Sequence, residues 1–136
     1  MPHFGNRSTD NLRTCHADLE RLFREVVKKF DCAVICGHRG RAEQDAAYHS
    51  GNSEKQWPDS YHNSQPSLAV DVCPYPIDWK DTARFYYFAG YVKGVAERLG
   101  IKDLRWGGDW DSDWQVNDQA FFDLAHWELR IDTRTE

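Results

Sequence analysis

The chain has no long hydrophobic run: no stretch approaches the roughly 18 apolar residues that a membrane-spanning helix requires. Its first residues, MPHFGNRSTD, have no basic segment followed by an apolar one, so we expect no signal peptide and synthesis in a cytoplasm. A surplus of positive charge is also missing, because the formal net charge is -5. We therefore expect binding to neither membrane nor nucleic acid.

Cysteine motifs are equally scarce. None of the four cysteines belongs to a CxxC pair, and Cys32 and Cys36 fall in an apolar run, where a free thiol commonly serves as a small buried hydrophobe. We expect reduced cysteines and no disulfide framework. Ligation of a metal ion by cysteine remains a minor alternative.

The residues that are present suit a globular protein. With 136 residues, of which 40% are hydrophobic, the chain is long enough for one core, and it shows no repeat or linker. We expect a single domain over residues 1–136, and a monomer. Apolar spacing predicts helices over residues 8–30, 42–50 and from about 78 or 81 to 99, with Gly100 as a stop. Short apolar runs predict strands at residues 32–36, 68–73, 104–106 and 126–131. This uneven order favours an α+β fold with a small, mainly antiparallel sheet packed against helices.

Two distant stretches carry residues that can hold a metal. His62 lies in a long polar loop over residues 52–67, Asp71 follows it on a predicted strand, and His126 lies on the last strand. Two imidazoles and one carboxylate are a ligand set of catalytic zinc, with the remaining position left open. Neighbouring strands would direct Asp71 and His126 from one sheet face, with His62 closing over them. The alternative is a loop histidine and a turn aspartate that bind nothing.

A hydrolytic zinc site also needs a general base. Asp123 can reach the site if the chain turns between residues 123 and 126, and Glu128 is the competitor because it shares a strand face with His126. If Asp123 is the base, Glu128 can orient a ligand imidazole. Arg39, in a glycine-flanked turn, could meet a substrate carboxylate or an oxyanion, or be a surface arginine.

Other residues near these motifs allow two interpretations each. Ser60 can contact substrate or stabilise its loop, and Asp109 can form a turn or support a ligand. The tryptophans are expected to be core and groove wall together; they are Trp106, Trp110, Trp114 and Trp127.

The stretches SYHNSQPSLAVDV and DLAHWEL resemble the zinc D-alanyl-D-alanine carboxypeptidase and dipeptidase family, which belongs with lysostaphin- and hedgehog-type metallopeptidases. GHRGRAEQDAAYHSG, PYPIDW and RWGGDW look most like the phage L-alanyl-D-glutamate peptidases, which are endolysins. The resemblance runs from about residue 36 to residue 129. Three features depart from the common pattern. The interval between His62 and Asp71 is lengthened by an insert that contains QPS, and position 68 is leucine. Position 123 is aspartate, where many members have glutamate.

The resemblance implies zinc ligands at His62, Asp71 and His126 and a catalytic carboxylate at Asp123. It also implies roles near the substrate for three further residues: Arg39, Gln44 and Ser60. The implied substrate is the stem peptide of bacterial peptidoglycan, cleaved between L-alanine and D-glutamate so that the host cell lyses, with no separate wall-binding domain. The enzyme would wait in the host cytoplasm and reach the wall after permeabilisation of the membrane.

Two other functions remain open at this point. A D-Ala-D-Ala carboxypeptidase or dipeptidase would use the same site on another bond. A zinc-stabilised wall-binding module without turnover would leave Asp123 and Arg39 without a purpose.

Overall fold

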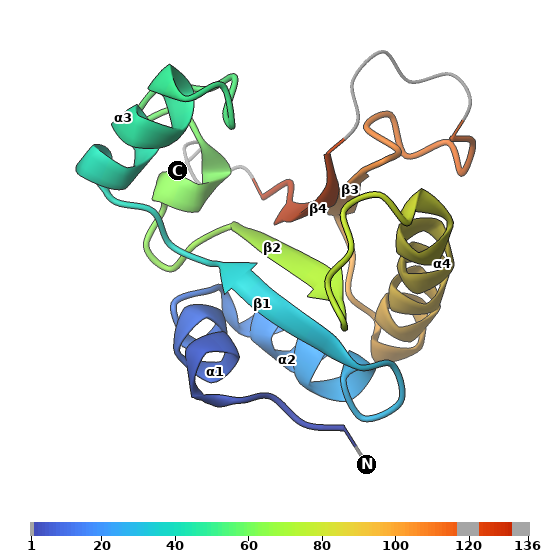
Figure 1. Ribbon diagram of the computed structural model, residues 1–136. Coiled ribbons are helices and arrows are strands. Elements are labelled where there is room, and N and C mark those ends of the chain that lie inside the picture. The colour runs from blue at the N-terminus through green and yellow to red at the C-terminus, as the bar shows by residue number, and fades with distance from the viewer. Residues whose placement is uncertain (1, 117–122, 132–136) are drawn as a thin grey trace.

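The computed structural model describes residues 2–116 and 123–131. A four-stranded antiparallel sheet with the order β1-β2-β4-β3 forms its centre (Figure 1). Helices α1 and α2 lie beneath the sheet in this view and α4 beside it, whereas α3 and the 3-10 helix η1 stand on the upper side. The expected α+β fold with a small antiparallel sheet packed against helices is therefore confirmed. The elements in chain order are α1 (Asn6–Arg13), α2 (Ala17–Val26), β1 (Cys32–Cys36), α3 (Arg41–His49), η1 (Tyr61–Asn63), β2 (Ala69–Pro74), α4 (Thr82–Leu99), β3 (Leu104–Gly107) and β4 (Asp123–Leu129).

The prediction of one helix over residues 8–30 is wrong, because the chain breaks between α1 and α2. The backbone at the break pairs with the loop before β2: the His16 N–H donates to the Ser67 carbonyl at 2.8 Å, and the Ser67 N–H donates to the Thr14 carbonyl at 2.8 Å. The His16 side chain then caps α2 by accepting from the Asp18 N–H at 3.1 Å. This pairing ties the helical layer to the loop that carries His62.

Helix α4 follows its predicted limits. The Asp81 side chain accepts from the Arg84 N–H at the start, and Gly100 ends the helix with a φ of 71°, in the left-handed region where glycine is favoured. Its apolar face packs on α2 and the sheet. The core contains residues from all these layers: Leu12, Leu19, Leu22, Phe23, Val70, Val72, Phe88, Val92, Trp106, Trp127 and Leu129.

The two central strands align the residues of interest. In the β2–β4 ladder Asp71 lies directly opposite His126, so both side chains leave the same face, as the sequence predicted. Strand β4 starts at Asp123 rather than at His126. The β3–β4 register shifts between Trp106 and Gly107, which brings Gly107 opposite Asp123. A side chain at Gly107 would collide with the Asp123 backbone, so this position requires glycine.

Within the described ranges, no helix combines the length and apolarity that a membrane span demands. The four cysteines are free thiols. Burial raises the pKa of Cys15 to about 12 and that of Cys73 to about 12, which keeps both thiols protonated.

Candidate active site

His62 is held in a fixed orientation by its own loop. Ser60 caps η1 by accepting from the His62 N–H at 3.1 Å, and the His62 ring is almost fully buried. Its Nδ1 lies 2.7 Å from the Gly37 carbonyl, which can only accept. Nδ1 therefore carries a proton, and Nε2 is the ring nitrogen that faces Asp71.

Asp71 Oδ1 lies between two imidazoles. It is 3.4 Å from His62 Nε2 and 3.3 Å from His126 Nδ1. Both Asp71 Oδ1 and His62 Nε2 are buried without a hydrogen-bond partner in the described structure. Orphaned buried polar atoms are rare and point to a missing ligand.

These distances fit a zinc ion. Ligands about 2.0–2.2 Å from a tetrahedral metal are separated from one another by roughly 3.3–3.5 Å. The two distances to Asp71 Oδ1 fall in this range, and the donor set of two nitrogens and one carboxylate oxygen is one that zinc accepts. Each of the two histidines could therefore share a metal ion with Asp71.

The charges of the metal-free site are strongly coupled. Burial alone would lower the pKa of His62, but the Asp71 carboxylate outweighs it and raises this pKa to about 10. Burial acts on His126 in the same direction, but the contacts of its ring with the carboxylates of Asp71 and Glu128 outweigh it and raise its pKa to about 9. Burial would raise the pKa of Asp71, but the two histidines hold it far below its usual range. Without metal, the site is an imidazolium–carboxylate cluster.

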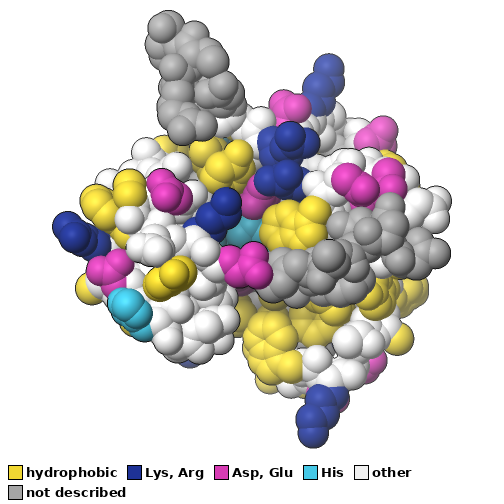
Figure 2. Space-filling model, turned by 90° about the horizontal axis from the view of Figure 1, so that it is seen from above, with side chains coloured by type: hydrophobic (Ala, Val, Ile, Leu, Met, Phe, Trp, Pro, Cys, Tyr) yellow, Lys and Arg dark blue, Asp and Glu magenta, His cyan; other side chains and the backbone are white. Residues whose placement is uncertain are grey.

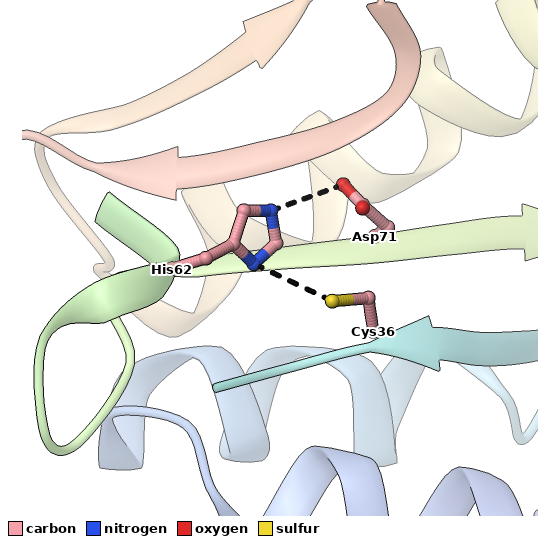
Figure 3. A group of neighbouring side chains, drawn as sticks. All are labelled: Cys36, His62 and Asp71. Atoms are coloured by element: carbon pink, nitrogen blue, oxygen red, sulfur yellow. Dashed lines mark hydrogen bonds and ion pairs between the residues drawn. The ribbon is translucent and has the colours of Figure 1, made fainter. Parts of the chain in front are cut away.

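Cys36 offers an alternative ligand, because the potential ligands at the site form two compact groups that share Asp71: Cys36, His62 and Asp71 in one, and Asp71, Asp123 and His126 in the other. Figure 3 shows that the His62 ring lies between the other two side chains, with one nitrogen toward Asp71 and the other toward Cys36. Cys36 Sγ lies 3.8 Å from Nδ1, the nitrogen already bound to the Gly37 carbonyl. One ion cannot contact opposite edges of the ring, so this geometry argues against Cys36 as a ligand of an ion held by His62 Nε2 and Asp71.

Glu128 binds the His126 ring on the nitrogen that faces away from Asp71. Its Oε1 accepts from His126 Nε2 at 2.7 Å, which leaves His126 Nδ1 free to face Asp71. The other oxygen, Oε2, accepts from Arg105 Nε at 2.9 Å. Burial would raise the pKa of Glu128, but the bond from His126 and the Arg105 guanidinium hold it below its usual range. Both oxygens of Glu128 are thus engaged, and this geometry disfavours it as a proton acceptor.

Asp123 faces the open side of the site. Its Oδ2 lies 4.0 Å from His126 Nδ1, and the side chain is 40% exposed. Partial burial, followed by the negative charge of Asp71, raises the pKa of Asp123 above the usual aspartate range. A carboxylate with a raised pKa beside a metal position suits proton transfer.

Arg39 lies beside Asp71 and lines the same cavity as Asp123. Its Nη1 donates to Gln44 Oε1 at 2.9 Å, and Nη2 lies 3.5 Å from Asp71 Oδ2. Gln44 is fully buried and donates in turn to Ser53 Oγ at 2.9 Å and to the Lys55 carbonyl at 2.7 Å. Gln44 therefore positions the guanidinium and the loop, and its burial excludes direct contact with substrate.

A cavity of about 380 Å³ opens over this cluster. Figure 2 shows a histidine at the base of a hollow, surrounded by basic, acidic and hydrophobic side chains. Of the residues discussed above, the cavity wall includes Arg39, Ser60, His62, Arg105, Trp110, Asp123, His126 and Glu128. The Trp110 ring lies 5.6 Å from the His126 ring and forms one side of the site.

Two sequence expectations need correction or refinement here. Trp127 is fully buried and stacks on Trp106 at a centroid distance of 5.7 Å, and strand alternation directs it away from His126, so it belongs to the core and not to the groove wall. Asp109 is buried and accepts from the Trp114 N–H at 2.8 Å and from Lys93 Nζ at 3.2 Å, which favours its interpretation as a loop organiser. Trp114 is 65% exposed and belongs to no core.

Sequence reasoning missed Arg105 and the Gly37 carbonyl. The Gly37 carbonyl is a backbone group and leaves no signature in the sequence. Arg105 lies opposite Glu128 in the β3–β4 ladder, so its role could have been found only by assigning that register.

Comparison with known proteins gives a consistent result. The family model described as phage L-alanyl-D-glutamate peptidase matches residues 1–130. The crystal structure of the Serratia marcescens L-Ala D-Glu endopeptidase ChiX is similar, with a TM-score of 0.72 and 28% sequence identity over 94% of this chain and 90% of that chain. None of the curated proteins matches this chain in sequence. With nearly its whole length matched and a hydrolase-like site in the same fold, the chain belongs to the phage L-alanyl-D-glutamate peptidase family.

Proposed function

We propose that this protein is a zinc-dependent endopeptidase that cleaves the L-alanyl-D-glutamate bond of peptidoglycan stem peptides. The observation that carries the proposal is the buried Asp71 oxygen that meets two imidazole nitrogens at 3.3 and 3.4 Å, below an open cavity. Membership in the peptidase family indicates which bond is cleaved.

His62, Asp71 and His126 would hold the metal, which when bound supplies an activated water and polarises the scissile carbonyl. Asp123 accepts a proton from the attacking water and returns it to the leaving amine, because its carboxylate is exposed at the cavity. Arg39, fixed by Gln44, stabilises the negative charge that develops on the carbonyl oxygen. Glu128 and Arg105 keep the His126 ring in place.

The test is digestion of a purified disaccharide-tetrapeptide fragment of cell wall, with the products identified by mass. We expect one product that ends in L-alanine and a second that begins with D-glutamate. Release of D-alanine alone would show a carboxypeptidase instead. No product at all, together with stoichiometric zinc in the protein, would show a binding module. Asp123→Asn is the matched variant and should abolish turnover.

We also propose that the protein acts on the host wall from within, after the membrane has been permeabilised. This rests on its phage-type family. Purified protein should lyse chloroform-treated Gram-negative cells and leave intact cells unaffected. Equal lysis of intact cells would contradict this route.

A further inference from the structure

A second cavity, of about 670 Å³, adjoins the first. The two share Arg39, Asn52 and Asp123 on their walls, and Asp71 borders the second one. The second cavity extends from the proposed catalytic carboxylate to Trp79, in the segment between β2 and α4. Together the cavities form one groove that passes through the site.

Trp79 has the geometry of a stacking platform. It is 58% exposed, and its ring stacks on Phe85 with a centroid distance of 5.6 Å and an interplanar angle of 21°. Phe85 is buried in a small apolar cluster with Cys73 and Ala125, which anchors it to the sheet. One face of the indole is therefore fixed while the other remains accessible. Ligand pockets are commonly lined by aromatic side chains together with a few polar groups, as the second cavity is.

The two halves of the groove differ in charge. The first cavity adds Lys55 and Arg105 to the shared Arg39, and its wall also carries carboxylates: Glu54, Asp59, Asp123 and Glu128. Along the described wall of the second cavity, Arg39 is the one lysine or arginine, beside the carboxylates Glu43, Asp71 and Asp123. The first cavity therefore offers more cationic side chains to an anionic ligand, whereas Trp79 offers a ring face to a neutral ligand in the second.

The proposed substrate has the same asymmetry. On the D-glutamate side of the scissile bond, the stem peptide carries free carboxylates. On the L-alanine side, a single residue, which spans at most about 3.6 Å, separates the bond from the lactyl group of N-acetylmuramic acid. That sugar is uncharged once its lactyl carboxyl is amidated, and its ring has an apolar face.

We propose that the second cavity binds the N-acetylmuramyl sugar of glycan-linked stem peptides, with the pyranose stacked on Trp79, while the peptide after the scissile bond occupies the first cavity. This inference rests on the proposed function. It makes the enzyme selective for stem peptides still attached to glycan.

The test compares two substrates: disaccharide-L-Ala-D-Glu-diaminopimelate, and the same peptide with an N-acetyl group in place of the sugar. Trp79→Ala should lower kcat/KM on the disaccharide substrate roughly tenfold, the loss expected for one aromatic stacking contact, and change it less than about twofold on the acetyl peptide. Trp79→Phe should retain most of the preference, which guards against a folding defect in the alanine variant. Tyr87→Ala, an exposed aromatic that borders neither cavity, is the matched control and should match the wild type on both substrates.

Equal kcat/KM of the wild type on both substrates would overturn the sugar site and leave the peptidase function intact. An equal loss on both substrates for Trp79→Ala would overturn it as well, because the residue would then support the fold or the chemistry. If the wild type cleaves neither substrate, the proposed function itself fails.

Discussion

Glu128 and Asp123 can be separated by one pair of isosteric substitutions. Glu128→Gln keeps the shape of the side chain but removes the charge that His126 Nε2 contacts at 2.7 Å. A hydrogen bond to a charged group contributes about 1.5–3 kcal/mol, and loss of the charge while an amide oxygen still accepts forfeits the lower end of this range. At 1.4 kcal/mol per decade, zinc affinity should fall roughly tenfold, in line with other residues that orient metal ligands. At saturating zinc, kcat should fall by less than about tenfold, because the proton acceptor is intact.

Asp123→Asn should give the opposite pattern. Zinc affinity should change by less than about threefold because Asp123 is not among the proposed ligands, whereas kcat should fall at least ~100-fold with the loss of the base. Zinc affinity is measured by competition with a chromophoric chelator and kcat by muropeptide cleavage at saturating zinc. Glu97→Gln, on the exposed side of α4, is the control for loss of one carboxylate. The reasoning is refuted if Glu128→Gln loses turnover at saturating zinc while Asp123→Asn retains it.

Four further results are expected. Saturating zinc at about 1,000 times its dissociation constant should stabilise the metal-free protein by about 4 kcal/mol and raise its Tm by roughly 10 °C; an unchanged melting curve would count against the site. Because the pKa values of His62 and His126 are raised to about 10 and about 9, zinc binding at pH 7 should release close to two protons. Calorimetry in buffers of different ionisation enthalpy measures this number, and release of no proton would contradict the proposed ligand set. Both folded-state pKa values lie above the unfolded value of about 6.5. The stability that these histidines contribute to the metal-free protein is therefore complete below about pH 6.5 and is lost as the pH rises through about 9 and 10. Urea denaturation across this pH range tests the expectation. Gly107→Ala should destabilise the fold by about 1–3 kcal/mol in urea denaturation because the new methyl group meets the Asp123 backbone, and a neutral result would show that β3 can move away.

The sequence predicted the strands that carry Asp71 and His126 because each alternates between an apolar and a polar face. It could not predict the break between α1 and α2. Leu12, Cys15 and Leu19 continue the helical spacing across the break, and only the pairing of the chain with Ser67, distant in sequence, interrupts the helix.

The site was predictable to a different extent for each residue. The residue types and the resemblance both pointed to His62, Asp71 and His126 as proposed ligands. The structure adds a reason to prefer Asp123 to Glu128 as the proposed base, because Arg105 occupies one oxygen of Glu128. The expectation for Trp127 failed for a local reason, since neighbours on a strand face opposite sides and Trp127 follows His126 directly.

The direct pairing of Asp71 with His126 makes β2 and β4 a rigid template, since a slip of one residue in either strand would send one of the two side chains into the apolar layer. Insertions or deletions inside these strands should therefore be intolerable. The arc between His62 and β2 is constrained at two points, because it has to return the imidazole to the Gly37 carbonyl and to pair Ser67 with the break between α1 and α2. Changes in length are therefore expected between these points, at residues 63–66, while the paired strands keep the proposed metal position in place.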